Sequence, residues 1–176
     1  RGASHPSDMV ERALGLGHKG IGIADRNTVA GVVRAWDTIR KARKWTQETI
    51  DAARRGDETE EQALQRKADA ESALATLEAF RVLTGARLCF SDGTPDIVAY
   101  PTNRHGWGRL TRLLSTGNLK PHVKKGDCDL VFADLLDHAE DMVLIAMAGE
   151  GDEEVLTALN RLLRGKLWLG AVMPRT

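Results

Sequence analysis

Short apolar segments alternate with helix-like segments along the chain, and this alternation constrains the fold more than any other feature. At residues 21–24 the run Ile-Gly-Ile-Ala predicts a strand, and Asn27 or Thr28 can cap a helix that begins with the valines of residues 29–33. A strand, a tight turn and a helix in succession form the unit from which parallel α/β folds are built. The sequence therefore predicts an α/β protein with a barrel or layered architecture.

The same patterns assign the remaining segments. Further strands are predicted over residues 82–90 (with an interruption at Gly85), 96–100, 142–147 and 167–173. Helices are predicted over residues 6–16, 29–53, 59–83, 107–114, 131–138 and 153–163. A polar loop with several lysines is expected over residues 117–128, and the sequence contains no internal repeat.

Residues 44–80 are interpreted as a helical hairpin, and their composition sets them apart. The segment is rich in Ala, Glu, Arg and Gln, and Thr59 and Gln62 have the spacing of a capping box at the start of its second helix. Apolar positions are sparse, which is typical of an arm that packs on one side only. A charged, solvated insertion is the simpler interpretation, and a dedicated binding arm is the alternative. Exposure of Trp36 and Trp45 would favour the binding arm.

Charge and composition weigh against several classes of function. The 25 basic and 25 acidic side chains cancel, whereas a domain that grips a nucleic-acid backbone usually has a basic excess. Cys89 and Cys128 have no CxxC spacing, so two buried thiols are expected instead of a zinc site. No apolar run approaches the roughly 20 residues that span a bilayer and no leader is recognised, so the expected location is the cytoplasm. The chain does not begin with Met, and both ends are expected to be cut.

Motif searches leave one candidate for chemistry. The sequence contains no phosphate-binding GxxxxGKS/T loop, no GxSxG nucleophile motif and no HExxH zinc motif. Asp25 follows the predicted strand 21–24, and a carboxylate at the C-terminal end of a parallel strand points to where α/β folds place their sites. The neighbouring Arg26 offers another interpretation, in which Asp25 only turns the chain or forms an ion pair. These residues alone leave both interpretations equally open.

Longer motifs resemble one known family. They are Arg-Gly-Ala-Ser-His-Pro at residues 1–6, Ile-Gly-Ile-Ala-Asp-Arg-Asn-Thr-Val-Ala-Gly at 21–31, Gly-Ala-Arg-Leu at 85–88, Asp-Gly-Thr-Pro-Asp at 92–96 and Gly-Arg-Leu-Thr-Arg-Leu-Leu at 108–114. Together they resemble the N-terminal PHP (polymerase and histidinol phosphatase) domain of bacterial error-prone C-family DNA polymerases, which are paralogues of the replicative α subunit. The resemblance extends over nearly the whole chain except residues 44–80, where the family usually has a much shorter connection.

The resemblance implies a fold and a position for the active site. The fold is a distorted β/α barrel of seven strands, of which residues 1–176 would form the N-terminal part and residues 44–80 an inserted helical hairpin. In active PHP domains, His, Asp and Glu side chains at the C-terminal ends of the strands hold a metal cluster. The first His-x-His motif of the family would precede residue 1, and its later ligands would follow residue 176.

The ligand motifs that align with this chain have mostly lost their metal donors. The Asp of the family's Leu-Asp-Gly motif falls on Arg1, and the His of its Thr-Asp-His motif falls on Arg26, so that only Asp25 is retained there. The Glu of the Gly-x-Glu motif falls on Arg87, and a further His falls on Asp96. The resemblance therefore predicts a vestigial pocket made of these residues.

Guanidinium groups at these positions argue against a metal site. A divalent cation needs anionic or neutral donors, whereas arginine stays charged. Two unit charges ~4 Å apart interact by about 4 kcal/mol at an effective dielectric of about 20, and beside Arg26 or Arg87 this interaction repels a cation. We expect Asp25 and Asp96 to pair with these two arginines in a salt-bridged pocket without metal. An alternative is that Arg1, Arg26 and Arg87 hold an anion such as sulfate or phosphate.

The function that the resemblance implies is structural. The segment would be a non-catalytic domain of an error-prone, damage-induced DNA-directed DNA polymerase that performs translesion synthesis, and it would need no cofactor. Magnesium is expected only in the palm domain of the full polymerase. Expected partners are the remaining polymerase domains, DNA through the full-length protein, the sliding clamp and accessory lesion-bypass proteins. Two alternatives remain: a metal-dependent PHP phosphoesterase or proofreading exonuclease, and a protein-interaction module built on residues 44–80.

Overall fold

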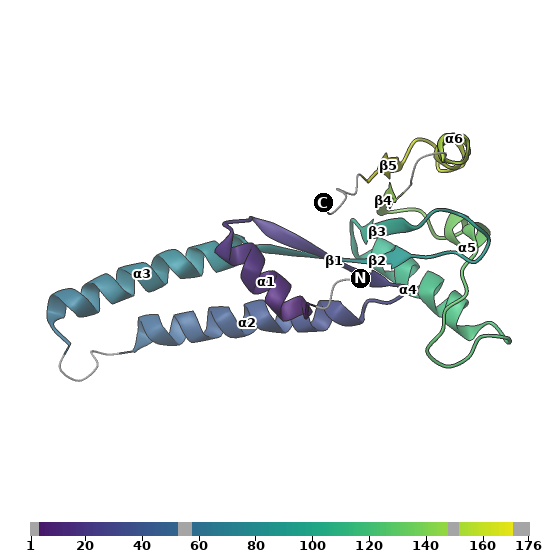
Figure 1. Cartoon of the computed structure of the whole chain (residues 1–176). Helices are drawn as coiled ribbons and strands as arrows, with labels where there is room; N and C mark the ends of the chain where they lie inside the picture. Colours follow the sequence, from purple (N-terminus) through teal and green to yellow (C-terminus); the bar gives the residue numbers. More distant parts are fainter. Residues whose placement is uncertain (1–3, 53–57, 148–151, 171–176) are drawn as a thin grey trace. The chain divides into compact units, whose positions relative to one another are not determined.

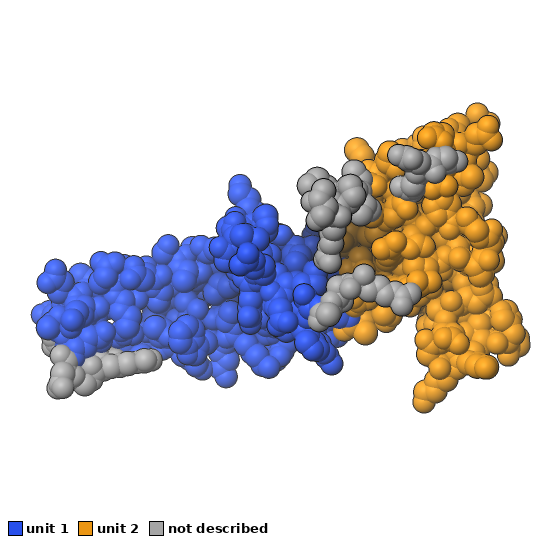
Figure 2. All heavy atoms as spheres, in the orientation of Figure 1, with its two compact units in different colours: residues 1–23, 31–83 blue, residues 24–30, 84–176 orange. Residues whose placement is uncertain are grey.

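The computed structural model describes residues 4–52, 58–147 and 152–170. The chain folds into two compact units (Figure 2). Unit 1 comprises residues 1–23 and 31–83, and unit 2 comprises residues 24–30 and 84–176.

Unit 1 is built on helices. They are α1 (Pro6–Gly15), nearly all of α2 (Ala30–Asp51) and α3 (Glu60–Ala79). α2 and α3 form the predicted hairpin and lie side by side in Figure 1. Two arginines join them: Arg43 donates from Nε and Nη2 to the Leu77 carbonyl oxygen (3.1 and 2.8 Å). Arg66 donates to the Thr49 carbonyl oxygen (3.1 Å).

The predicted capping box at the start of α3 is confirmed. The Thr59 backbone N–H donates to Gln62 Oε1 (2.9 Å), and the Gln62 backbone N–H donates to Thr59 Oγ1 (3.3 Å). Further along α3, Leu77 is the buried residue of the helix in the described part of the chain. α3 is therefore largely solvated, as its sparse apolar positions predict.

A mixed sheet runs through the described residues in the order β1-β2-β3-β4-β5. Its strands are β1 (Gly20–Arg26), β2 (Arg81–Leu88), β3 (Ile97–Pro101), β4 (Met142–Ala146) and β5 (Leu167–Leu169). β3 runs antiparallel to both β2 and β4, whereas β5 runs parallel to β4. The short connection between β2 and β3 suits an antiparallel pair, and helix α6 (Glu153–Leu162) provides the crossover that the parallel pair β4–β5 needs.

The core of unit 2 lies between the sheet and two helices, α4 (Arg104–Leu119) and α5 (Phe132–Leu136). Side chains alternate along β3 and β4, so that Ile97 and Leu144 are fully buried. Leu110 of α4 is fully buried in the same cluster. Burial of each such side chain contributes about 1.5–3 kcal/mol, so this cluster stabilises the scaffold that carries the site.

Most predicted segments are confirmed, and the differences have local causes. β2 runs through Gly85 without the predicted interruption; a Cβ atom at Gly85 would lie 2.5 Å from the Ala99 carbonyl oxygen, so glycine is needed there for close strand approach. α4 begins earlier than predicted because the Asn103 side chain caps it, accepting from the Gly106 backbone N–H (2.9 Å). The predicted end of the last strand, residues 171–173, lies outside the described residues.

The α/β class is confirmed, because helices alternate with the strands of a mixed sheet. The described strands do not show the seven-stranded barrel that the resemblance implies. Among the helices of residues 4–52, 58–147 and 152–170, none is long and apolar enough to cross a membrane.

Candidate functional site

The predicted site residues within the described part of the chain lie in unit 2, at or beside strand ends. Asp25 and Arg26 close β1, Arg87 is the penultimate residue of β2, and Asp96 directly precedes β3. Arg1 lies outside the described residues. Arg26, Arg87 and Asp96 all act electrostatically on one thiol, that of Cys89, so the structure brings these three charges together.

Arg87 and Asp96 form an ion pair, with Arg87 Nε 2.7 Å from Asp96 Oδ2. The strand register explains the contact. Arg87 lies opposite Val98, so Asp96 is its diagonal neighbour on the same face of the sheet. The predicted pairing of these two residues is confirmed. Their side chains are 48% and 28% exposed, so solvent screening limits the pair to at most about 1 kcal/mol of unfolding free energy.

The other predicted pair, Asp25 with Arg26, is not formed. In the described residues of unit 2, no ion pair joins Arg26 to a carboxylate. Asp25 and Arg26 are consecutive in β1, and successive side chains of a strand point to opposite faces. Asp25 makes interactions of its own, among them a backbone bridge to Thr28. The prediction was wrong because it paired sequence neighbours without regard to strand geometry.

The thiol of Cys89 lies close enough to these three charges to be affected by them. Its side chain is buried, with 6% of the residue exposed, as predicted for this thiol. Burial, followed by the nearby Asp96, raises the pKa of Cys89 to about 11 against the opposing positive charges of Arg26 and Arg87. The thiol is therefore protonated at neutral pH and is not an activated nucleophile.

A polar cavity of about 870 Å³ lies beside this cluster in unit 2. It is lined by Arg26, Asn27, Thr28, Cys89, Phe90, Ser91, Asn118, Lys125, Gly126, Asp127 and Cys128. The lining comes from three stretches: the end of β1, the segment after β2, and the end of α4 with the loop that follows it. Two cationic residues, one acidic residue, two hydroxyl residues and two amide residues thus line one hollow.

Asn27 holds the first two of these stretches together. Its Nδ2 donates to the Cys89 carbonyl oxygen (3.1 Å), and its Oδ1 accepts from the Cys89 backbone N–H (2.8 Å). The Asn27 backbone N–H also donates to the Arg87 carbonyl oxygen (2.9 Å). Asn27 has φ = 48°, a left-handed conformation that asparagine tolerates better than most residues. One side chain therefore fixes the turn after β1 to the end of β2.

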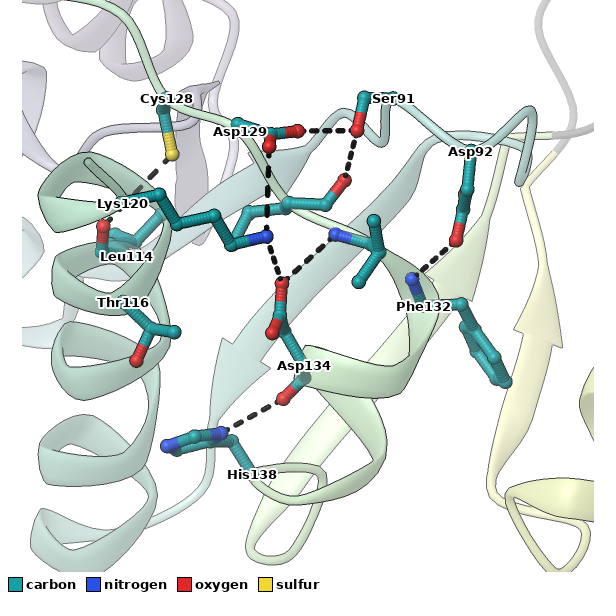
Figure 3. Close-up of polar contacts among 12 residues, drawn as sticks. Ser91, Asp92, Leu114, Thr116, Lys120, Cys128, Asp129, Phe132, Asp134 and His138 are labelled. Carbon is teal, nitrogen blue, oxygen red and sulfur yellow. Dashed lines mark hydrogen bonds and ion pairs between the residues drawn. The ribbon is translucent and has the colours of Figure 1, made fainter. Parts of the chain in front are cut away.

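The loop after α4 is fixed by a network of ion pairs centred on Lys120 (Figure 3). Lys120 Nζ lies 2.9 Å from Asp134 Oδ2 and 3.7 Å from Asp129 Oδ2. Asp129 also accepts from the Ser91 hydroxyl, and its Oδ2 lies 2.7 Å from His122 Nε2. Ser91 lines the cavity, so the network ties the wall formed by the loop to the wall formed by the segment after β2.

These contacts favour the charged forms of the loop residues. Hydrogen bonds from Ser91 and His122, together with the positive charge of Lys120, hold the pKa of Asp129 below its usual value. The hydrogen bond to Asp134 raises the pKa of Lys120 above its usual value. At neutral pH both ends of the network carry full charge.

The sequence interpretation missed this network. It assigned residues 131–138 to a helix but gave no partner to Asp134, whose carboxylate is 18% exposed and pairs with Lys120. One signal was present: Asp134 stands three residues after Val131 and accepts from the Val131 backbone N–H (3.0 Å), as in a capping box. The partnership of Ser91 with Asp129, 38 residues apart, had no local signal.

The donor set of the site does not fit a divalent metal. Two guanidinium groups, from Arg26 and Arg87, lie near Cys89, and the nearby carboxylate of Asp96 is already engaged by Arg87. Arginine has no lone pair to offer at accessible pH, and its charge repels a cation. Among the described residues, no three His, Cys, Asp or Glu side chains are grouped so that they share a metal position.

Comparison with known proteins connects the chain to polymerases. No protein-family model matches it. Error-prone DNA polymerase 1 of Rhizobium meliloti is 42% identical over 175 residues, covering 96% of this chain and 12% of that polymerase. The error-prone DNA polymerase of Brucella abortus is 38% identical over 180 residues, covering 98% and 13% respectively. That of Rhodopseudomonas palustris is 46% identical over 134 residues, covering 76% and 9%. The chain spans about an eighth of the first two relatives and is similar to one segment of bacterial error-prone DNA polymerases.

Proposed function

We propose that the chain is a non-catalytic scaffold domain, the N-terminal part of a PHP domain, within an error-prone DNA-directed DNA polymerase. Its similarity to one segment of such polymerases supports the polymerase context. Residues 1–176 would supply part of a seven-stranded barrel, and residues 44–80 would be an insertion in it. The role of the domain is to stabilise the polymerase by packing against its other domains.

The observation that carries this proposal is the Arg87–Asp96 ion pair. The two residues occupy the positions where the resemblance places a metal-binding Glu and His. Instead of binding a metal, they form an ion pair with 2.7 Å between Arg87 Nε and Asp96 Oδ2. Arg26, at the position of another His, adds a second positive charge beside them. A metal ion would have to displace a charge-assisted hydrogen bond and approach two guanidinium groups, which is unfavourable.

The proposal places catalysis and most partners outside this segment. Nucleotidyl transfer belongs to the palm domain of the full polymerase, with magnesium. DNA, the sliding clamp and accessory lesion-bypass proteins engage the full-length protein, which works in the cytoplasm during damage-induced translesion synthesis. The segment itself requires no cofactor.

The scaffold role is tested in the full-length polymerase with a core variant and a matched surface variant. Leu144→Ala removes a fully buried side chain of β4 and is expected to cost about 2–5 kcal/mol of stability. Val143→Ala, one residue away and 37% exposed, is the control. We expect Leu144→Ala to lower the yield of folded polymerase and its primer-extension activity, and Val143→Ala to leave both unchanged. Normal folding and activity with Leu144→Ala would contradict the proposal.

Assays on the 176-residue chain address the phosphoesterase and exonuclease alternative. The chain is incubated with manganese or zinc and either a phosphate monoester or a 3′-labelled DNA primer. We expect hydrolysis at the background rate, because the donor set does not fit a metal. Hydrolysis above background that disappears in Asp96→Asn would support the enzyme instead.

A second candidate role is suggested by two exposed tryptophans on α2. Trp36 is 53% exposed and Trp45 is 69% exposed. Exposed tryptophan is uncommon on a solvated arm and is enriched at protein interfaces. Because the chain spans about an eighth of its relatives, we propose that α2 packs against another region of the same polymerase.

Hydrogen exchange tests the hairpin role. Amides of residues 36–45 should exchange more slowly in the full-length polymerase than in the 176-residue chain, and substitution of Trp36 and Trp45 by Ser should abolish the difference. Equal exchange in both proteins would exclude the hairpin as an internal docking surface.

A further inference from the structure

We infer that a second cavity of unit 2, at the edge of the sheet where β4 and β5 begin, binds a small organic acid. Arg164 and Lys166 hold the carboxylate of the ligand, and leucines that line the same cavity hold its short apolar body. The cavity measures about 280 Å³. The inference adds a ligand site and does not depend on the scaffold role proposed above.

This cavity is separate from the site beside Cys89. Cys89 follows the end of β2, where the sheet also places the start of β3 and the end of β4, because Ile97 pairs with both Leu88 and Ala146. The second cavity is lined by Lys166, which directly precedes β5, and by Glu140, two residues before β4. β4 and β5 are parallel, so both begin at the other edge of the sheet. The two cavities share no lining residue.

Four leucines form the apolar part of the lining. Leu144 of β4 is fully buried and Leu163 is 5% exposed, and both belong to the core cluster of unit 2. Leu136, the last residue of α5, and Leu162, the last residue of α6, are 40% and 56% exposed. The first two leucines give the cavity a floor that the core holds in place. The other two form a rim whose apolar surface a ligand would remove from water, which is favourable.

The charged residues of the lining favour an anion. In the described residues of unit 2, neither Arg164 nor Lys166 forms an ion pair with a carboxylate. Glu140 is the one acidic residue of the lining, and its carboxylate is paired with Arg109. The planar guanidinium of Arg164 matches the two oxygens of a carboxylate, and the ammonium of Lys166 adds a point charge.

The backbone of Arg164 has a conformation that glycine usually provides. Its φ is 54°, in the left-handed region. The Arg164 backbone N–H donates to the Arg161 carbonyl oxygen (3.1 Å), and the Gly165 backbone N–H donates to the Asn160 carbonyl oxygen (2.8 Å). These two hydrogen bonds form a Schellman motif, in which the left-handed residue is usually glycine because a Cβ atom is strained there. An arginine held at a strained position suggests that its side chain has a function.

The turn between α6 and β5 fixes both cations. Besides the two hydrogen bonds of the Schellman motif, the Lys166 backbone N–H donates to the Leu163 carbonyl oxygen (3.1 Å). Arg164 and Lys166 are therefore tied to Leu163, which is itself part of the core. A turn that needs no ordering on binding loses less entropy when the ligand binds.

The size of the cavity sets the size of the ligand. Sites for small organic molecules measure about 300–1,000 Å³, and about 280 Å³ lies at the lower end of this range. A short alkyl chain with one carboxylate therefore suits the cavity better than a long-chain lipid does. Octanoate has this chemistry and is the probe for the site.

Calorimetric titration of the 176-residue chain tests the inference with four probes: octanoate, 1-octanol, octylammonium and acetate. We expect saturable binding of octanoate and binding at least about tenfold weaker for 1-octanol, which lacks the charge. Octylammonium should not bind, because the two cations repel it, and acetate should not bind, because it has no apolar body for the leucines.

Two variants remove the cations. Lys166→Met should weaken octanoate binding about tenfold, the usual effect of losing one charge-assisted hydrogen bond. Arg164→Gly should weaken it by a similar factor and should raise the Tm, because glycine relieves the strain at φ = 54°. An arginine that only stabilises the end of α6 through its charge would give the opposite result, a lower Tm with unchanged binding.

Matched controls remove the same charges nearby. Arg161→Gln deletes an exposed guanidinium from the last turn of α6, and Arg104→Gln deletes one at the start of α4. Neither residue lines the cavity. Both variants should bind octanoate as the unmodified chain does.

The inference is overturned if octanoate shows no saturable binding, if 1-octanol binds as tightly as octanoate, or if the controls weaken binding as much as the site variants. The titration is repeated with the full-length polymerase, where a loss of octanoate binding would show that another region covers the cavity and would also overturn the inference. Should Arg164→Gly fail to fold, Lys166→Met still decides the question. None of these outcomes bears on the Leu144→Ala test of the scaffold role, which involves no ligand.

Discussion

The side chain of Asn27 forms hydrogen bonds with both backbone polar groups of Cys89, 62 residues away, at 3.1 and 2.8 Å. Asn27 thus acts as an extra strand residue that continues the pairing of β1 with β2 for one more position. It does so at φ = 48°, where the chain turns away from the sheet. The side-chain amide of Asn27 therefore helps to position the turn that carries Arg26 and Thr28, together with the backbone hydrogen bond from Asn27 to Arg87.

Substitutions of Asn27 separate the contribution of its side chain from that of its conformation. Asn27→Ala should lower the free energy of unfolding by about 2–4 kcal/mol, since two hydrogen bonds are lost and alanine is strained at positive φ. Asn27→Gly removes the same hydrogen bonds without that strain and should be about 1 kcal/mol more stable than Asn27→Ala. Urea unfolding measures the free energy of unfolding of both variants. Equal stability of Asn27→Ala and the unmodified chain would contradict this role.

An added Cβ atom should destabilise α4 at Gly117 but not at Gly108. A Cβ atom at Gly117 would lie 2.6 Å from Leu130 Cδ2 and 2.7 Å from Cys128 Sγ, and Leu130 is fully buried and has no room to move. Gly117→Ala should therefore destabilise the protein by about 1–3 kcal/mol despite the better helix propensity of alanine.

Gly108→Ala is the matched control on the same helix. Nothing lies within 4 Å of its added Cβ atom, so it should be neutral or stabilise the protein by up to about 1 kcal/mol. Thermal unfolding of the two variants gives the comparison. If Gly117→Ala is as stable as Gly108→Ala, the prediction is wrong, because Leu130 and Cys128 would then move aside for the added Cβ atom without a loss of stability.

The pKa of the Cys89 thiol should change when the charge of Arg87 or Asp96 is removed. Its pKa is about 11, raised by burial and by Asp96 and lowered by Arg26 and Arg87. Arg87→Gln should therefore raise the pKa further, and Asp96→Asn should lower it. The thiolate absorbance of Cys89 is followed against pH in a Cys128→Ala background. Shifts in the same direction for both variants would mean that the ion pair does not face the thiol.

The Lys120 network should stabilise the loop over a wide range of pH. The depressed pKa of Asp129 means that its contribution is complete above the unfolded value of about 3.9 and is lost as pH falls through the folded value. The raised pKa of Lys120 means that its contribution is complete below about 10.4 and is lost as pH rises through its folded value.

The difference in Tm between the unmodified chain and Lys120→Met should accordingly be constant between these limits and shrink outside them. Lys124→Met, which removes a charge from the same exposed loop, should cause no such difference. A Tm difference that varies strongly between pH 5 and 8 would assign the effect to a histidine such as His122 instead.

Local patterns in the sequence predicted most of the fold. The apolar runs that became β1, β3 and β4 were recognisable because each is short, β-branched and bounded by turn residues. The capping box of Thr59 and Gln62 located the start of α3, because its two hydrogen bonds involve residues only three positions apart. The antiparallel placement of β3 against β4 has no local signature, because helices α4 and α5 separate them in sequence.

The site was less predictable for the same reason. Arg87 and Asp96 were paired correctly because a short hairpin connects them, so that distance in sequence reflects distance in space. Asp25 and Arg26 were paired wrongly because adjacency along a strand separates side chains. The contribution of Lys125 and the Ser91–Asp129 contact depends on how the loop after α4 folds back, which only the three-dimensional structure gives.

Manganese titration, followed by electron paramagnetic resonance of the free ion, tests the central claim most directly. If guanidinium groups have replaced the metal donors, the 176-residue chain should bind no manganese at a saturable site, and Asp96→Asn should behave like the unmodified chain. Binding of manganese with defined stoichiometry that is lost in Asp25→Asn or Asp96→Asn would contradict the account.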